Sequence, residues 1–228
     1  MRRRPLYVDC SGHNLEKLSK LEIKTRSRRA YMIRTRNVAI LIFNDVEVLD
    51  FCGPFEVFSV TNETHSLKPF NVYTVAEQDK PVIARNNLSV NPRYTINNCP
   101  KPDILIVPGG QGTRKEMNNP VIVNWVKESF EHLELLLSVC TGALVLAKAG
   151  LLDGLTATTH HEALDLLKKA APHTKIVKDE RFVDNGKIIL SAGISAGIDM
   201  SFYVVEKLLD KNAVLATSKH MEYNLNVG

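Results

Sequence analysis

The segment that most constrains the fold covers residues 133–152, with the sequence LELLLSVCTGALVLAKAGLL. An apolar run with strand character ends at Cys140, and the small pair Thr141-Gly142 follows it. An apolar, alanine-rich stretch then predicts a helix that ends near Gly150. A sharp turn from strand to helix leaves its turn residue exposed at the carboxyl edge of a sheet, as in the nucleophile elbow of serine hydrolases. The segment therefore predicts such an elbow, with a cysteine in place of the serine.

Cys140 has two interpretations on this local pattern. Backbone N–H groups and the macrodipole at a helix N-terminus stabilise a thiolate and lower the pKa of the thiol, which favours a nucleophile. The alternative is a structural cysteine, because free cysteines are among the most frequently buried residues.

Strand-like and helix-like segments alternate through most of the chain. Strands are expected at 37–43, 70–76, 103–110, 133–139 and 156–159, and helices at 51–63, 120–130, 161–171 and 197–209. The helix at 51–63 is expected to begin at Gly53-Pro54, since proline is tolerated near a helix N-terminus. Residues 81–99 are expected to form a loop or a small β excursion, and residues 181–193 a hairpin turned at Asn185-Gly186. This alternation predicts an α/β fold of flavodoxin-like type, a mostly parallel sheet with helices on both faces.

Three features that are distant in the sequence follow predicted strands. They are Asp50, the pair Gly109-Gly110, and Cys140. Ligands of doubly wound sheets bind beyond the carboxyl ends of the strands, so these residues are expected to meet there. Their convergence favours a functional Cys140 over a structural one.

A cysteine nucleophile needs a proton partner and donors for a developing oxyanion. Gly109, Gly110 and the N–H of Thr141 are the candidate donors, because glycine lets the backbone approach a ligand closely. A plain turn is the alternative for the glycine pair. Asp50 is the candidate acid/base group, although an aspartate at this place is also a good N-cap for the following helix.

His160 and Asp199 complete the set of candidate residues. His160 follows the strand-like TATT segment and is expected to face the same crevice, with a surface or helix-capping histidine as the alternative. Adjacent histidines do not share a helix face, so His160 and His161 are not expected to bind a metal together, and no metal or cofactor is predicted. Asp199 lies at the start of the last predicted helix, where complementing the helix dipole is the alternative role.

Composition limits the classes of protein to consider. The chain has 228 residues, and its four cysteines form no CxxC pair, which favours free thiols in a reducing cytoplasm. No apolar run is long enough to cross a bilayer, so no membrane association is expected. Residues 1–36 carry a net charge of +8 and residues 37–228 a net charge of −4. The first segment is expected to be a disordered basic extension, although it slightly resembles a transit peptide; the second is one domain without the basic face that nucleic-acid binding requires.

Several motifs together resemble the ThiJ/PfpI superfamily, the class I glutamine-amidotransferase-like fold. They are LDFCGPFEVF, PGGQGT, SVCTGALVLAKAGLLDG, ATTHH and SAGISAGIDMSFYVVE, within residues 37–224. They look most like the branch that contains the isonitrile hydratases and the sensor domains of AraC-type regulators. This resemblance implies functional roles for Asp50, Cys140, Thr141 and Asp199.

The resemblance implies a cysteine-dependent hydratase that converts an isonitrile and water to an N-substituted formamide, acting on a small molecule as a homodimer. The alternative is a non-catalytic small-molecule sensor or an oxidative-stress protein of the same superfamily. Protease and glyoxalase activities are less expected, because those relatives carry histidine where this chain has Thr141. His161 stands where branch members often have an aromatic residue, which bears on the shape of the pocket.

Overall fold

A computed structural model describes residues 34–225 of the chain. A compact unit begins at Thr35, and most of the predicted basic extension lies outside the described residues. Among residues 34–225, none of the helices combines the length and hydrophobicity that crossing a bilayer requires.

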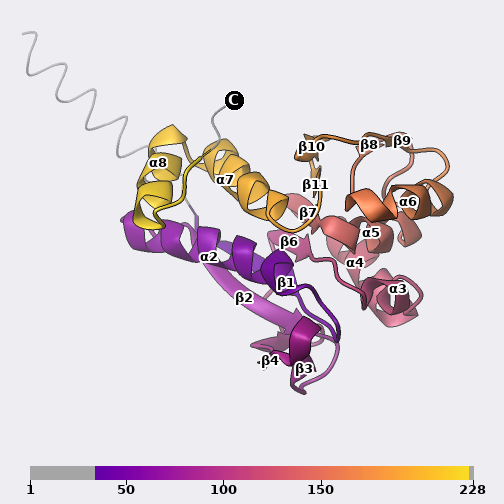
Figure 1. Ribbon diagram of the computed structural model, residues 1–228. Coiled ribbons are helices and arrows are strands. Elements are labelled where there is room, and N and C mark those ends of the chain that lie inside the picture. The colour runs from indigo at the N-terminus through magenta and orange to yellow at the C-terminus, as the bar shows by residue number, and fades with distance from the viewer. Residues whose placement is uncertain (1–33, 226–228) are drawn as a thin grey trace, which may run out of the picture. The chain divides into compact units, whose positions relative to one another are not determined.

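A seven-stranded sheet forms the centre of the molecule, in the order β10-β11-β7-β6-β1-β2-β5 (Figure 1). All neighbouring strands are parallel except β10, which runs antiparallel to β11 at one edge. This confirms the predicted mostly parallel sheet. The strands are β1 (Arg36–Leu41), β2 (Phe70–Ala76), β5 (Tyr94–Thr95), β6 (Ile104–Val107), β7 (Leu135–Val139), β10 (Phe182–Asp184) and β11 (Ile188–Ser191).

The central strands are apolar along their whole length because both faces of the sheet are covered. Every residue of β6 and of β7 is buried, and the two strands pair in register from Ile104 with Leu135 to Val107 with Ser138. Their carboxyl ends therefore lie side by side. The loops that follow Val107 and Val139 begin at the same edge of the sheet.

Helices cover both faces of the sheet (Figure 1). One group consists of α2 (Val48–Thr64), α7 (Ala196–Leu208) and α8 (Lys211–His220), which pack against one another. The other group consists of α3 (Thr113–Glu116), α4 (Pro120–Phe130), α5 (Ala143–Lys148) and α6 (Leu164–Ala170). The short α3 and the C-terminal α8 were not among the predicted elements.

The start of α2 differs from the prediction. The helix begins at Val48, so Pro54 lies inside it rather than at its N-terminus. A proline there removes the hydrogen bond from its own nitrogen to the carbonyl four residues earlier, that of Asp50. Burial of the helix against α7 and α8 offsets this loss, because packing overrides propensity.

Two short pairs of strands lie outside the central sheet. Within residues 81–99, β3 (Val82–Ile83) pairs antiparallel with β4 (Ser89–Val90) around the 3-10 turn η1 (Arg85–Asn87). The TATT segment contributes β8 (Thr156–Ala157), which pairs with β9 (Lys175–Ile176). The hairpin predicted at Asn185-Gly186 is confirmed between β10 and β11.

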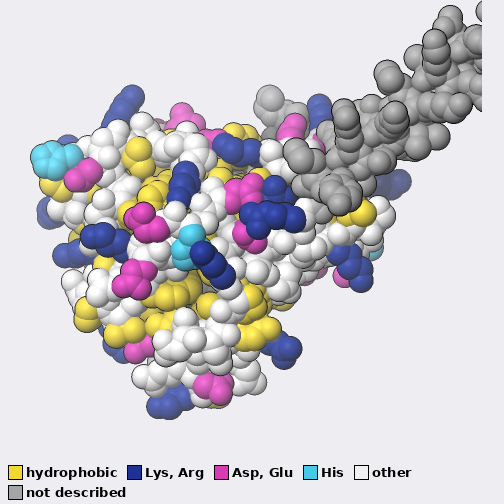
Figure 2. Space-filling model, turned by 180° about the vertical axis from the view of Figure 1, so that it is seen from behind, with side chains coloured by type: hydrophobic (Ala, Val, Ile, Leu, Met, Phe, Trp, Pro, Cys, Tyr) yellow, Lys and Arg dark blue, Asp and Glu magenta, His cyan; other side chains and the backbone are white. Residues whose placement is uncertain are grey.

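Charges of both signs are interspersed on the face of the molecule that Figure 2 shows. Lysine and arginine side chains alternate there with aspartate and glutamate, and no side of this face is uniformly basic.

Candidate active site

The elbow after β7 has the geometry that the sequence predicts. Cys140 has a φ of +56°, in the left-handed region that non-glycine residues rarely occupy. It opens the 3-10 turn η2 (Cys140–Gly142), which leads directly into α5. Its backbone is fixed on both sides, because its N–H donates to the Ala192 carbonyl at 3.1 Å and its carbonyl accepts from Oγ1 of Thr159 at 2.7 Å.

The turn can approach the end of β6 only because Gly142 has no side chain. A Cβ at Gly142 would lie 2.0 Å from the Val107 carbonyl oxygen. The strain at Cys140 is therefore maintained by the packing of two neighbouring strand ends, which is how proteins keep such conformations at functional sites.

Asp50 lies in the first turn of α2, and it is completely buried. It is not the N-cap, which is Glu47, so the structure corrects the capping interpretation. Oδ2 of Asp50 accepts a hydrogen bond from the Gly109 N–H at 3.0 Å. Within the described part of the chain, Oδ1 has no hydrogen-bond partner of ordinary geometry, although it is buried. The carboxyl group is therefore directed at the site instead of at its own helix.

The carboxyl of Asp50 raises the pKa of the Cys140 thiol, whereas the hydrogen bond with Cys140 lowers the pKa of Asp50. Burial, opposed by the hydrogen bonds to the carboxyl, raises the pKa of Asp50 to about 7. Burial and the nearby carboxylate raise the pKa of Cys140 to about 12. This corrects the expectation of a lowered thiol pKa, since the helix N-terminus cannot offset burial beside a carboxylate. The pair consequently holds one shared proton above neutral pH.

The predicted donors Gly109 and Gly110 have their N–H groups engaged within the protein. Gly109 donates to Asp50, and Gly110 donates to Oγ1 of Thr141 at 3.0 Å. The Thr141 hydroxyl, which also accepts from Oγ1 of Thr113 at 2.9 Å, is held between α3 and the glycine pair. These contacts fix the loop, and neither glycine N–H is aimed at a ligand.

Two other N–H groups act on the thiol. The N–H groups of Thr141 and Ile194 both lower the pKa of Cys140, and that of Ile194 also lowers the pKa of Asp50. Thr141 was a predicted donor, whereas sequence reasoning missed Ile194. Ile194 has a φ of +51°, which is rare for a β-branched residue, and no pattern in the sequence indicates it.

A cavity of about 110 Å³ gives access to Cys140. His160, predicted to face this crevice, lines it together with Cys140, Thr141, Gly110 and Ile194. The remaining lining residues include the charged side chains Glu47, Arg85, Arg114 and Glu162. The Nδ1 of His160 also accepts from the Glu162 N–H at 3.3 Å, so this histidine both caps the following 3-10 turn η3 (His161–Ala163) and faces the cavity.

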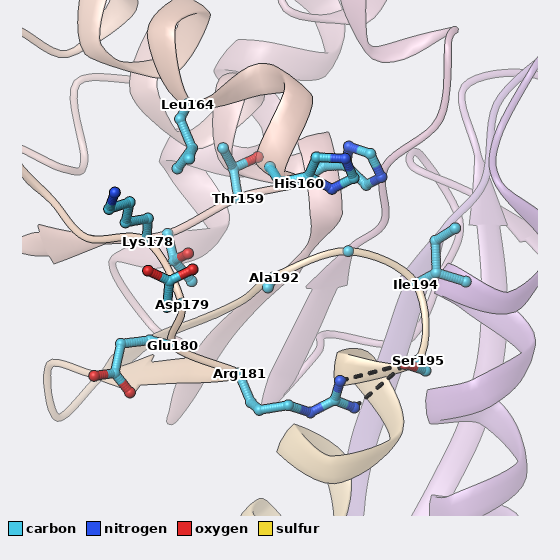
Figure 3. A pocket seen from close by; sticks show the side chains of 13 residues that line it. Thr159, His160, Leu164, Lys178, Asp179, Glu180, Arg181, Ala192, Ile194 and Ser195 are labelled. Carbon is cyan, nitrogen blue, oxygen red and sulfur yellow. Dashed lines mark hydrogen bonds between the residues drawn. The ribbon is translucent and has the colours of Figure 1, made fainter.

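Asp199 lies elsewhere. It is in the first turn of α7, where its Oδ2 accepts from Nε of Arg181 at 2.6 Å and its Oδ1 from the Tyr223 hydroxyl at 2.7 Å. It does not line the Cys140 cavity. Its partner Arg181 lines a second cavity of about 570 Å³, shown in Figure 3, and also donates to Oγ of Ser195.

A doubly wound sheet with a cysteine at a strand-to-helix elbow defines an α/β protein of the nucleophile-elbow class. The sequence pattern of the DJ-1/PfpI family matches residues 36–207, and the chain belongs to this family. Among solved structures, a ThiJ/PfpI family protein from Pseudomonas syringae superposes with a TM-score of 0.77 at 25% identity, covering 97% of this chain and 84% of that one. DJ-1beta from Drosophila melanogaster superposes with a TM-score of 0.72 at 17% identity, covering 84% of this chain and all of that one.

Two curated relatives have different activities. The isonitrile hydratase of Pseudomonas putida is 34% identical over 188 residues, which are 82% of this chain and 78% of that protein. The HTH-type transcriptional regulator CdhR of Pseudomonas aeruginosa is 32% identical over 70% of this chain, which spans only 47% of the regulator.

Proposed function

We propose that the protein is a hydratase of isonitrile-hydratase type, which adds water to R–NC to give an N-substituted formamide. One observation carries this proposal: a fully buried Asp50 carboxyl lies beside the elbow thiol of Cys140, and its pKa is raised to about 7. A group with that pKa both donates and accepts a proton at neutral pH, which general acid–base catalysis requires. The 34% identity to an isonitrile hydratase over most of both chains supports the same reaction.

The first step joins the sulfur of Cys140 to the terminal isonitrile carbon. The thiol proton passes to Asp50 as the C–S bond forms, and Asp50 returns it to the same carbon, leaving a thioimidate R–N=CH–S. The N–H groups of Thr141 and Ile194, which lower the pKa of the thiol, stabilise the thiolate as it forms. The raised thiol pKa makes Asp50 necessary, because few thiols would otherwise ionise at neutral pH.

The second step adds water to the C=N bond. Asp50 takes a proton from the water as the water oxygen bonds to the carbon, and it passes this proton to the nitrogen. The hydroxyl proton of the adduct then moves through Asp50 to the sulfur as the C=O bond forms and the C–S bond breaks, and the formamide leaves. The sum is R–NC plus water to R–NH–CHO, with both the cysteine and the carboxyl restored.

A second candidate function is the binding of a small molecule without turnover. Homology to the regulator CdhR favours it, as does the raised pKa of Cys140, which makes the thiol a poor nucleophile unless a base assists. In that case Cys140 is a ligand contact or an oxidisable thiol.

A homodimer fits either function by family membership, and light scattering that reports a monomer would contradict it.

The decisive experiment is turnover of cyclohexyl isocyanide by the wild type, Cys140→Ala and Asp50→Asn, with formamide measured by chromatography. Asp50→Asn keeps the shape of the side chain and an acceptor for the Gly109 N–H, but removes the proton carrier. We expect no activity in Cys140→Ala and a loss of about 10² to 10⁴ in Asp50→Asn. Binding of the isocyanide without any formamide in the wild type would support the sensor instead, and full activity in Asp50→Asn would remove Asp50 from the mechanism.

A further inference from the structure

Two cavities share a wall formed by His160 and Ile194. The smaller cavity, about 110 Å³, contains Cys140, whereas the larger, about 570 Å³, does not, and both residues line both spaces. Pockets that hold a complete small-molecule ligand are typically about 300–1,000 Å³. The Cys140 cavity by itself has room for a reactive group and little more.

On the basis of the proposed function, we propose that the larger cavity binds the substituent of the substrate while the reactive carbon of the substrate lies at Cys140. His160, between the two spaces, is the specificity-determining residue that limits how large the substituent can be. The substrate class is therefore an isonitrile with a large substituent.

The ring of His160 is placed so that it can separate or join the two cavities. It lies directly against Gly193, where a Cβ would be 2.4 Å from Cδ2 of the imidazole. Its polar and ring contacts within residues 34–225 are a 3.3 Å hydrogen bond from the Glu162 N–H to Nδ1, a 3.9 Å approach of the exposed Glu162 carboxylate to Nδ1, and a tilted ring contact with the exposed His161. Little therefore opposes rotation of the ring away from Gly193.

The larger cavity has an apolar part and a polar part. Leu164 and Ala192 supply aliphatic surface, and Lys178, Asp179 and Arg181 supply charged groups. Figure 3 shows Leu164 and Thr159 across the cavity from Arg181 and Ser195.

Arg181 is a fixed part of this wall. Its guanidinium is held by Asp199 and Ser195, and Asp199 is held in turn by Tyr223. A substituent that fits both parts of the cavity is amphipathic, with an apolar body beside Leu164 and a polar end near Lys178 and Arg181.

The test fills the larger cavity without touching the elbow. Leu164→Trp places an indole in it from α6, and Asp165→Trp, one residue further along the same helix, adds the same side chain outside the lining residues. The substrates are methyl isocyanide and 2-naphthyl isocyanide. We expect Leu164→Trp to lower kcat/KM for the naphthyl compound by about tenfold or more and to leave the methyl compound within about twofold, while Asp165→Trp changes neither.

A second readout does not need turnover. Cys140 is alkylated with iodoacetamide and with an iodoacetamide that carries a naphthyl group, and the modified peptide is quantified. Leu164→Trp should slow only the bulky reagent, and His160→Ala should accelerate it. If no isonitrile is converted but this pattern appears, the proposed function fails and the cavity assignment stands.

Three results would overturn the inference. They are failure of the bulky reagent to reach Cys140 in the wild type, equal slowing of both reagents by Leu164→Trp, and equal effects of Leu164→Trp and Asp165→Trp. Melting curves for each variant show that the comparison is made on folded protein.

Discussion

At the scale of single residues, the site depends on one buried carboxyl. Asp50 could have been an ordinary N-cap, and its position three residues into α2 removes that role and directs its side chain across to Gly109. A carboxyl buried beside a thiol favours its protonated form, because burial penalises charge. The same burial that prepares Asp50 for proton transfer therefore carries a cost in stability at higher pH.

This cost gives a prediction for the free energy of unfolding. The pKa of Asp50 is about 7 in the folded protein, whereas its ordinary value is 3.8. At a pH between 3.8 and 7, the folded protein therefore binds a proton that the unfolded chain does not. Stability contributed by the protonated carboxyl is complete below about pH 4 and is lost as the pH rises through 7. Asp50→Asn has no such loss. The free energy of unfolding of the variant, minus that of the wild type, should therefore rise by up to about 4 kcal/mol from pH 4 to pH 8. Urea unfolding of both proteins across this range is the measurement, and a difference that does not change with pH would contradict it.

At the scale of elements, the site is built where the carboxyl ends of β6 and β7 lie side by side. The loop after β6 supplies Gly109 and Gly110, and the turn after β7 supplies Cys140 and Thr141. Gly110 has a φ of +126°, which an L-residue rarely adopts. The glycine pair thus joins α2 to the elbow by close backbone approach, a role different from binding an oxyanion.

Gly109→Ala tests this role. A Cβ there would lie 2.6 Å from the Thr141 nitrogen and 2.7 Å from Oδ2 of Asp50, contacts that require the loop to shift. We expect a loss of about 1–3 kcal/mol in stability, typical of overpacking, together with loss of activity because Asp50 and Thr141 separate. Gly154→Ala is the control, since its Cβ meets nothing within 4 Å, although its positive φ will itself cause a smaller loss of stability. A fully active and stable Gly109→Ala would show that the loop tolerates the displacement.

At the scale of the whole molecule, a seven-stranded sheet between two groups of helices forms the main body of the described residues. The core runs through the central strands and continues into α2 and α7. The excess of basic charge is concentrated in residues 1–36, most of which lie outside the described residues.

We therefore predict that residues 1–33 are dispensable for folding. The compact unit begins at Thr35, and its first strand begins at Arg36. A chain that lacks residues 1–33 should melt within a few degrees of the full chain, because a loss of 1 kcal/mol shifts Tm by only about 2–4 °C in a domain of this size. Calorimetry of both proteins is the measurement; a large fall in Tm or insoluble protein would show that the segment packs on the domain.

Elements whose signals are local could be predicted from the sequence alone. The strand at 70–76, the helix at 120–130, the hairpin at Asn185-Gly186 and the elbow at Cys140 all follow from apolar runs, turn residues and breakers within a few positions. The strand expected at 103–110 covers only Ile104–Val107, because the glycine pair belongs to the loop that follows it. Because parallel strands end at one edge, their order also brought Asp50, Gly109 and Cys140 together. The start of α2 was misjudged, because Pro54 is a strong local signal that packing overrides.

What these residues face depends on how distant elements pack together. The pKa of Asp50 and of Cys140 depends on how completely other elements exclude water from both side chains, which no local pattern encodes. Ile194 adopts a backbone conformation that its side chain disfavours and lowers the pKa of the thiol from there, and Asp199 is paired with Arg181. Hydrogen-bond partners and burial are properties of the whole packed chain, whereas strand and turn signals belong to the few residues that carry them.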